Sequence, residues 1–203
     1  MTFSSLCIFL LVLGAGAAIP GPDIVAILAR ALSHGFKNTL ALISGILFGH
    51  ALWTVAAALG LVVLVQTLGS AFVVIKFAAA IYLIYLAWNL WNSHTEATLS
   101  SADNSNDRRS GFISGLLISL SNPKAMIFFG TVMPTVLPIA NLTVLQLVFV
   151  LFLSTTTMFI VFGAWAAVAS RARIALQNAS SRRALNRGSA LALAGAGIAI
   201  AAR

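Results

Sequence analysis

Two short stretches decide the fold of this chain, Pro20-Gly21-Pro22-Asp23 and Ser121-Asn122-Pro123-Lys124. Each interrupts an apolar run: the first separates residues 3–19 from residues 24–29, and the second lies within residues 111–137. Proline lacks an amide donor and clashes with the preceding turn, so both stretches predict a broken helix. Broken backbone is tolerated at membrane depth only where it is buried in protein or lines a cavity. One isolated proline would favour a simple kink, whereas two matched breaks indicate a site.

The composition identifies a membrane protein. Of the 203 residues, 60% are hydrophobic and only 8% are charged, whereas about 25% are charged in soluble domains. At about 20 residues for each spanning helix, the chain has room for six spans and for no separate soluble domain. The net charge of +8 does not indicate a nucleic-acid partner, because the cations lie between apolar runs and form no cluster. The single cysteine, Cys7, excludes an intrachain disulfide and a thiolate metal cluster.

The remaining predicted spans and the charges between them set the topology. These spans are residues 39–65, 70–91, 144–169 and 185–202. Nine of the twelve Lys and Arg residues follow the first, third and fifth spans, and the other two connections carry no charge. Since Lys- and Arg-rich short loops stay in the cytoplasm, we expect both termini outside. A polar loop at 93–110 divides one membrane domain, 1–203, into repeats at about 1–92 and 111–203, and three helices in each half make the repeats inverted.

Three charged residues inside the spans are the first candidates for function. Asp23 is the only acid there, and Lys76 and Lys124 are the only lysines. Each would cost several kcal/mol against lipid, so we expect all three to face the interior, unless Lys76 reaches the outer surface. A structural ion pair between Asp23 and Lys124 is one interpretation. The other is a binding site for a zwitterion, in which Asp23 attracts a cation and an anion meets Lys124.

The breaks also predict two helix N-termini that point into the membrane interior. Asp23 would cap a helix that begins at Ile24, and Ser121 or Asn122 would cap one that begins at Pro123. The positive ends of both helices would attract a carboxylate.

His50 and two pairs of glycines complete the candidate residues. His50 lies within the second span, as a proton relay or as a neutral, packed side chain. The GxxxG spacings Gly45/Gly49 and Gly111/Gly115 predict close contact between helices. The sequence contains no HExxH motif and no pair of acids within the spans, which argues against a metal enzyme.

Several of these residues together resemble a known family. They are Pro20-Gly21-Pro22-Asp23, Gly35, Gly45, Gly49, Lys76, Tyr82-Leu83, Tyr85-Leu86, Asn122-Pro123-Lys124-Ala125, Phe128, Phe129 and Pro134. The pattern is similar to that of the LysE/RhtB amino-acid exporters and covers nearly the whole chain. The chain departs from it at Ala79 and Ala87, where glycine is usual, at Asp23, where asparagine is common, and at Thr135, where glutamine is usual.

The resemblance implies efflux of amino acids or close derivatives across a bacterial inner membrane, driven by protons. The predicted site comprises Pro20, Gly21, Pro22, Asp23, Asn122, Pro123, Lys124 and Lys76, with His50 as a proton relay. The expected partners are a small zwitterion, protons, the bilayer and a second copy in a homodimer, with no cofactor, metal or nucleic acid. A small oligomeric pore and a scaffold that does not transport are the alternatives.

Overall fold

The computed structural model describes residues 1–60 and 104–175 continuously, with isolated positions between 77 and 92 and between 184 and 198. Its α-helices are α1 (Phe3–Ala18), α2 (Pro22–His34), α3 (Phe36–Ala58), α6 (Asn104–Ser121), α7 (Pro123–Ile127), α8 (Met133–Val136) and α9 (Val144–Ala175). A π-helical turn, η1 (Phe128–Val132), joins α7 to α8, and a 3-10 turn, η2 (Ile139–Asn141), precedes α9. All regular secondary structure in the described part of the chain is therefore helical. Most of the predicted spans 70–91 and 185–202, residue Lys76 and residues 93–103 lie outside the described residues.

Both proline motifs break a helix, as predicted. The pair α1 and α2 bends by 56°, and the pair formed by residues 108–121 and 123–136 bends by 54°. Among the described residues, α3 and α9 are each long and apolar enough to cross a membrane, and each bent pair adds a further span if it crosses as one unit. Four of the six predicted spans thus have a helical counterpart in the structure.

Three helix boundaries differ clearly from the prediction. The helix α3 ends at Ala58, before the predicted end of its span at residue 65, and two other helices extend beyond their spans. The helix α6 begins at Asn104 and α9 continues to Ala175, whereas the sequence predicted spans at 111–137 and 144–169. Arg108, Arg109, Arg171 and Arg173 therefore lie on helices rather than in loops. Arginine is a good helix former, so a helix can continue past the end of its apolar stretch.

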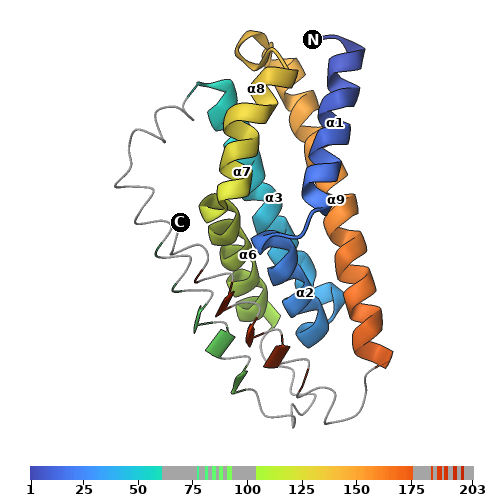
Figure 1. Ribbon diagram of the computed structural model, residues 1–203, viewed down its shortest axis with the longest axis vertical. Helices are drawn as coiled ribbons and strands as arrows, with labels where there is room; N and C mark the ends of the chain where they lie inside the picture. Colours follow the sequence, from blue (N-terminus) through green and yellow to red (C-terminus); the bar gives the residue numbers. More distant parts are fainter. Residues whose placement is uncertain are drawn as a thin grey trace.

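The two bent pairs run in opposite directions (Figure 1). The chain descends through α1 and α2, and it ascends through α6, α7 and α8. Both α2 and α7 begin midway along the bundle and lead to opposite ends of it. This arrangement is the one expected of inverted repeats, but the full repeat stays a prediction because the third helix of each half lies mostly outside the described residues.

Glycines allow the backbones of α3 and α6 to come into direct contact. A Cβ atom on Gly45 would lie 2.0 Å from the carbonyl oxygen of Phe112, and one on Gly115 would lie 2.0 Å from that of Leu42. A Cβ atom on Gly49 would lie 2.6 Å from the Ser119 side chain. The two GxxxG spacings therefore belong to one helix pair, in which each helix supplies glycine to the other.

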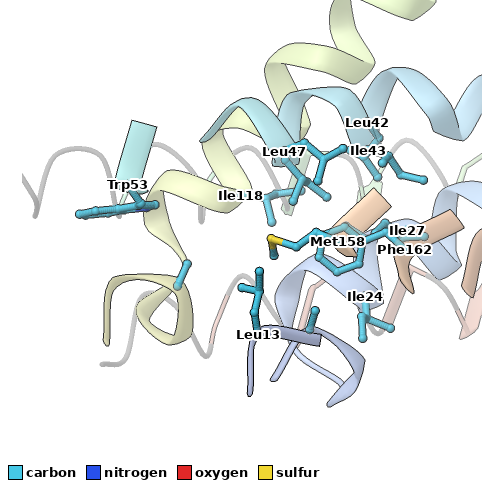
Figure 2. Close-up of a cluster of buried hydrophobic side chains, with 14 of the residues drawn as sticks. Leu13, Ile24, Ile27, Leu42, Ile43, Leu47, Trp53, Ile118, Met158 and Phe162 are labelled. Atoms are coloured by element: carbon cyan, nitrogen blue, oxygen red, sulfur yellow. The ribbon is translucent and has the colours of Figure 1, made fainter. Parts of the chain in front are cut away.

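Much of the buried core lies between α1, α2, α3, α6 and α9, and Ala125, Phe129 and Met133 of the segment from α7 to α8 also belong to it. Figure 2 shows Met158 and Phe162 of α9 among side chains from the other four helices. These include Leu13 of α1, Ile24 and Ile27 of α2, Leu42, Ile43 and Leu47 of α3, and Ile118 of α6. Burying an aliphatic or aromatic side chain is worth about 1.5–3 kcal/mol in water; within a bilayer the same contacts act through packing instead.

Candidate functional site

The helix that follows the first break begins two residues earlier than the sequence indicated. The structure places Gly21 at the N-cap of α2, with no capping side chain, and Pro22 at the first helical position. Asp23 lies within the first turn and does not cap a helix that begins at Ile24, so that prediction was wrong. The physical reason is that proline carries the helical φ already and has no amide to leave unpaired. Asp23 still lies next to the positive end of α2.

The second break has one of the predicted N-cap residues, Asn122, and the side chain of this residue also contacts the first break. Asn122 accepts a 3.0 Å hydrogen bond from the backbone amide of Lys124, through Oδ1. Its amide nitrogen, Nδ2, donates to Asp23 Oδ2 over 2.9 Å. Ser121 takes no part in the cap, because its hydroxyl donates to the Leu117 carbonyl at 2.7 Å. One buried side chain therefore both starts α7 and connects the two breaks.

His50 is the third polar group at this point. Its Nε2 atom lies 3.5 Å from Asp23 Oδ2, and its ring packs against Phe129 and Phe162 at centroid distances of 5.5 and 6.2 Å. Asp23 is 8% exposed and His50 4%. Two buried polar atoms here, Asp23 Oδ1 and His50 Nδ1, have no hydrogen-bond partner among the described residues. Polar atoms without a partner are costly to bury. Their presence is typical of a binding site, where a ligand can supply the missing partner.

Lys124 does not form the ion pair with Asp23 that the sequence left open. The basic side chain near Asp23 in the described chain is His50, whose Nε2 atom lies 3.5 Å from Oδ2 and which would form an ion pair only if it were protonated. The Lys124 ammonium instead donates a 2.7 Å hydrogen bond to the carbonyl oxygen of Ile19, which follows the last residue of α1. The bend leaves that carbonyl without its helical partner, and a flexible lysine can reach it.

A small cavity lies where these groups meet. Its volume is about 40 Å³, which holds a few water molecules and is too small for an amino acid. Its polar lining residues are Asp23, His50, Asn122 and Lys124. The remaining lining residues are apolar or glycine: Leu13, Gly16, Ala17, Ile19, Gly21, Ile24, Ala125, Phe128, Phe129, Met158 and Phe162. A carboxylate and an ammonium beside an apolar wall complement a small zwitterion.

The structure brings together most of the predicted site residues. Gly21, Asp23, Asn122 and Lys124 line the cavity with His50, while Pro20, Pro22 and Pro123 shape the two breaks. Phe129, Met158, Phe162 and the Ile19 carbonyl had no predicted role. For Phe129, Pro134 was a partial indication in the sequence, because a proline disturbs the preceding turns of a helix. Phe128 and Phe129 lie in the π-helical turn before this proline. Among the described residues, no cluster of His, Cys, Asp or Glu could hold a metal ion.

These features define a class of protein: a helical membrane protein with two broken spans that meet at a polar cavity. Residues 15–203 match the family model of the LysE type translocators. The chain therefore belongs to the LysE translocator family, which places it among transporters and not among enzymes.

Curated relatives agree with this assignment. The homoserine/homoserine lactone efflux protein of Salmonella typhimurium is 28% identical over 202 residues, which cover 97% of this chain and 96% of that protein. The leucine efflux protein of Enterobacter sp. is 28% identical over 112 residues, or 55% of this chain and 53% of that protein. An uncharacterized membrane protein of Haemophilus influenzae is 33% identical over 127 residues, and the match spans 60% of each chain. No solved structure matches the chain.

Proposed function

We propose that this protein exports small amino acids or close derivatives from the cytoplasm in exchange for protons. The observation that carries the proposal is the meeting of Asp23, His50, Asn122 and Lys124 in one cavity between the two breaks. The family assignment and the names of the Salmonella and Enterobacter relatives support efflux of an amino acid. The net charge of the site is balanced when Asp23 and Lys124 are ionised and His50 is neutral, so a zwitterion adds no net charge to it.

Each end of the substrate has a partner in this proposal. The carboxylate binds the ammonium of Lys124 and the positive end of α2, since both carry charge of the opposite sign. The ammonium binds the Oδ1 atom of Asp23, which has no partner among the described residues. The substrate side chain lies against Phe128, Phe129 or Met158, which are apolar. The cavity must widen for this, because an amino acid exceeds its volume of about 40 Å³.

Asp23 is the proton acceptor in the proposed exchange. When the site opens outward, protonation of Asp23 removes the charge that holds the substrate ammonium and promotes release. His50 lies 3.5 Å from the same carboxylate oxygen and serves as the relay through which the proton arrives. A ligand shifts such an equilibrium only by its different affinity for the two states, and the charge on Asp23 supplies that difference.

Counterflow in proteoliposomes tests the proposal. Purified protein is reconstituted with unlabelled L-homoserine or L-leucine inside, and uptake of the labelled amino acid is followed. An exporter accumulates label transiently above the equilibrium level, because exchange is coupled. A pore gives equilibration without this overshoot, and a scaffold that does not transport gives neither; both results would reject the proposal.

We also infer that both termini face outward. The end of α2, the start of α3, the start of α6 and the end of α9 lie toward the same end of the bundle, and the N-terminus lies at the other end (Figure 1). These helix ends carry Arg30, Lys37, Arg108, Arg109 and Arg173. Positive residues of this kind face the cytoplasm. Protease protection of an N-terminal tag in spheroplasts tests the inference, since an outward terminus is cleaved in intact spheroplasts and an inward terminus is protected.

A further inference from the structure

The Lys124 side chain joins the two breaks through a backbone atom. Its ammonium donates to the carbonyl oxygen of Ile19 over 2.7 Å, between residues 105 positions apart in the sequence. In an unbroken helix the Ile19 carbonyl would accept from the amide of Asp23, four residues later. The bend of 56° removes that partner. Lys124 therefore supplies the hydrogen bond that the Ile19 carbonyl loses at the break.

The lysine crosses the break to reach this carbonyl. A Cβ atom on Gly21 would lie 3.5 Å from Lys124 Cδ and 3.7 Å from Nζ, so the lysine stem lies along the backbone of the first break. Ile19, Gly21 and Lys124 all line the cavity. The contact is therefore part of the cavity wall, where a bound substrate would meet it.

The same ammonium is the partner that the proposed function gives to the substrate carboxylate. The Ile19 carbonyl is a neutral acceptor, whereas a carboxylate carries a full negative charge that adds Coulomb attraction to its hydrogen bond with the ammonium. A carboxylate that enters the cavity is thus the stronger acceptor. The wall must also move, because a cavity of about 40 Å³ does not hold an amino acid.

We propose that Lys124 is a latch. Its ammonium holds the two sides of the first break together by its bond to the Ile19 carbonyl, until the carboxylate of an amino acid replaces that carbonyl as the acceptor. The release by carboxylate rests on the proposed function, whereas the latch itself does not. Amino acids with a free carboxylate should open the break. Homoserine lactone has an ester in place of the carboxylate and should leave the latch closed.

Hydrogen exchange of the full chain in detergent measures the latch directly. The amides of Ile19 and Val25 report on the two sides of the first break, because they bond to Ala15 and Gly16 and to Gly21, respectively. Lys124→Gln should speed their exchange about tenfold, since a hydrogen bond to a charged group is worth roughly that factor or more. Lys37→Gln is the matched control, because it removes the same charge from an exposed position on α3.

The outcomes separate the latch from the proposed function. Exchange at the first break that is equal in wild type and Lys124→Gln would overturn the latch. Faster exchange in wild type with L-homoserine, and not with homoserine lactone, supports release by a carboxylate; equal effects of the two compounds, or no effect of either, would overturn it. Homoserine counterflow on the same preparation tests the proposed function alone, since a protein without counterflow can still show the effect of Lys124→Gln on exchange.

Discussion

Asn122 donates a 2.9 Å hydrogen bond to Asp23, although 99 residues separate them. Each residue belongs to a proline break, so this bond connects the two breaks at the centre of the bundle. Asn122 is 1% exposed and also caps α7. The bond therefore fixes the position of the only acid in the predicted spans and couples it to the second half of the chain.

Substitution of Asn122 should separate these two roles. Asn122→Ala loses the cap, worth about 1 kcal/mol, and the bond to a buried carboxylate, worth about 2 kcal/mol. Asn122→Ser can retain the cap and loses only the bond to Asp23, so its stability should lie between those of wild type and Asn122→Ala. Thermal unfolding in detergent, followed by tryptophan fluorescence, gives the order. Equal stability of Asn122→Ser and wild type would contradict a stabilising bond to Asp23.

Asp23→Asn should uncouple export from protons. The amide keeps the size of the side chain and cannot ionise, so an acidic exterior should no longer accelerate homoserine efflux from proteoliposomes. In the wild-type protein the same pH gradient should accelerate it, since protonation from outside weakens the hold on the substrate ammonium. Asp107→Asn is the control for loss of an acid, because Asp107 lies near the start of α6, far from both breaks along the chain. Full acceleration in Asp23→Asn would show that another group carries the proton.

His50→Phe should distinguish a proton relay from a packing residue. Phenylalanine can keep the ring contacts with Phe129 and Phe162, so we expect a melting temperature close to that of wild type. It cannot contact Asp23 through a ring nitrogen, so proton-driven efflux should slow by about a hundredfold or more, the lower end of the range for a lost acid–base group. A His50→Phe variant with unchanged response to the pH gradient would indicate that His50 only packs.

Gly45→Ala and Gly115→Ala should each destabilise the fold. The added methyl group would lie 2.0 Å from a backbone oxygen of the facing helix, so α3 and α6 must separate. Overpacking of this kind costs about 1–3 kcal/mol, measured as lower thermal stability and a lower yield of monodisperse protein. Gly163→Ala on α9 is the matched control, since nothing lies within 4 Å of its added Cβ atom. A loss of stability in the control as large as in Gly45→Ala would contradict this explanation.

The sequence predicted the breaks because proline acts locally. Pro22 and Pro123 each occupy a first helical position, and a residue that lacks an amide donor disrupts a helix whatever surrounds it. The same holds for the apolar spans, which follow from composition and length. The N-cap residue of α2 was harder to predict, because Asp23 and Gly21 can both precede a helix. The choice between them depends on how Pro22 is placed.

The contacts between the halves depend on the tertiary structure. The sequence shows Asp23, His50, Asn122 and Lys124 as four separate polar residues, and it allowed an ion pair between Asp23 and Lys124. Packing of α3 against α6 and of α2 against α9 instead places His50 and Asn122 at Asp23 and directs Lys124 to a backbone carbonyl. Partner choice depends on distances of a few ångströms across the bundle, and no local propensity encodes them. The sequence by itself thus determined where the helices break, and the tertiary structure decided which polar groups meet at the breaks.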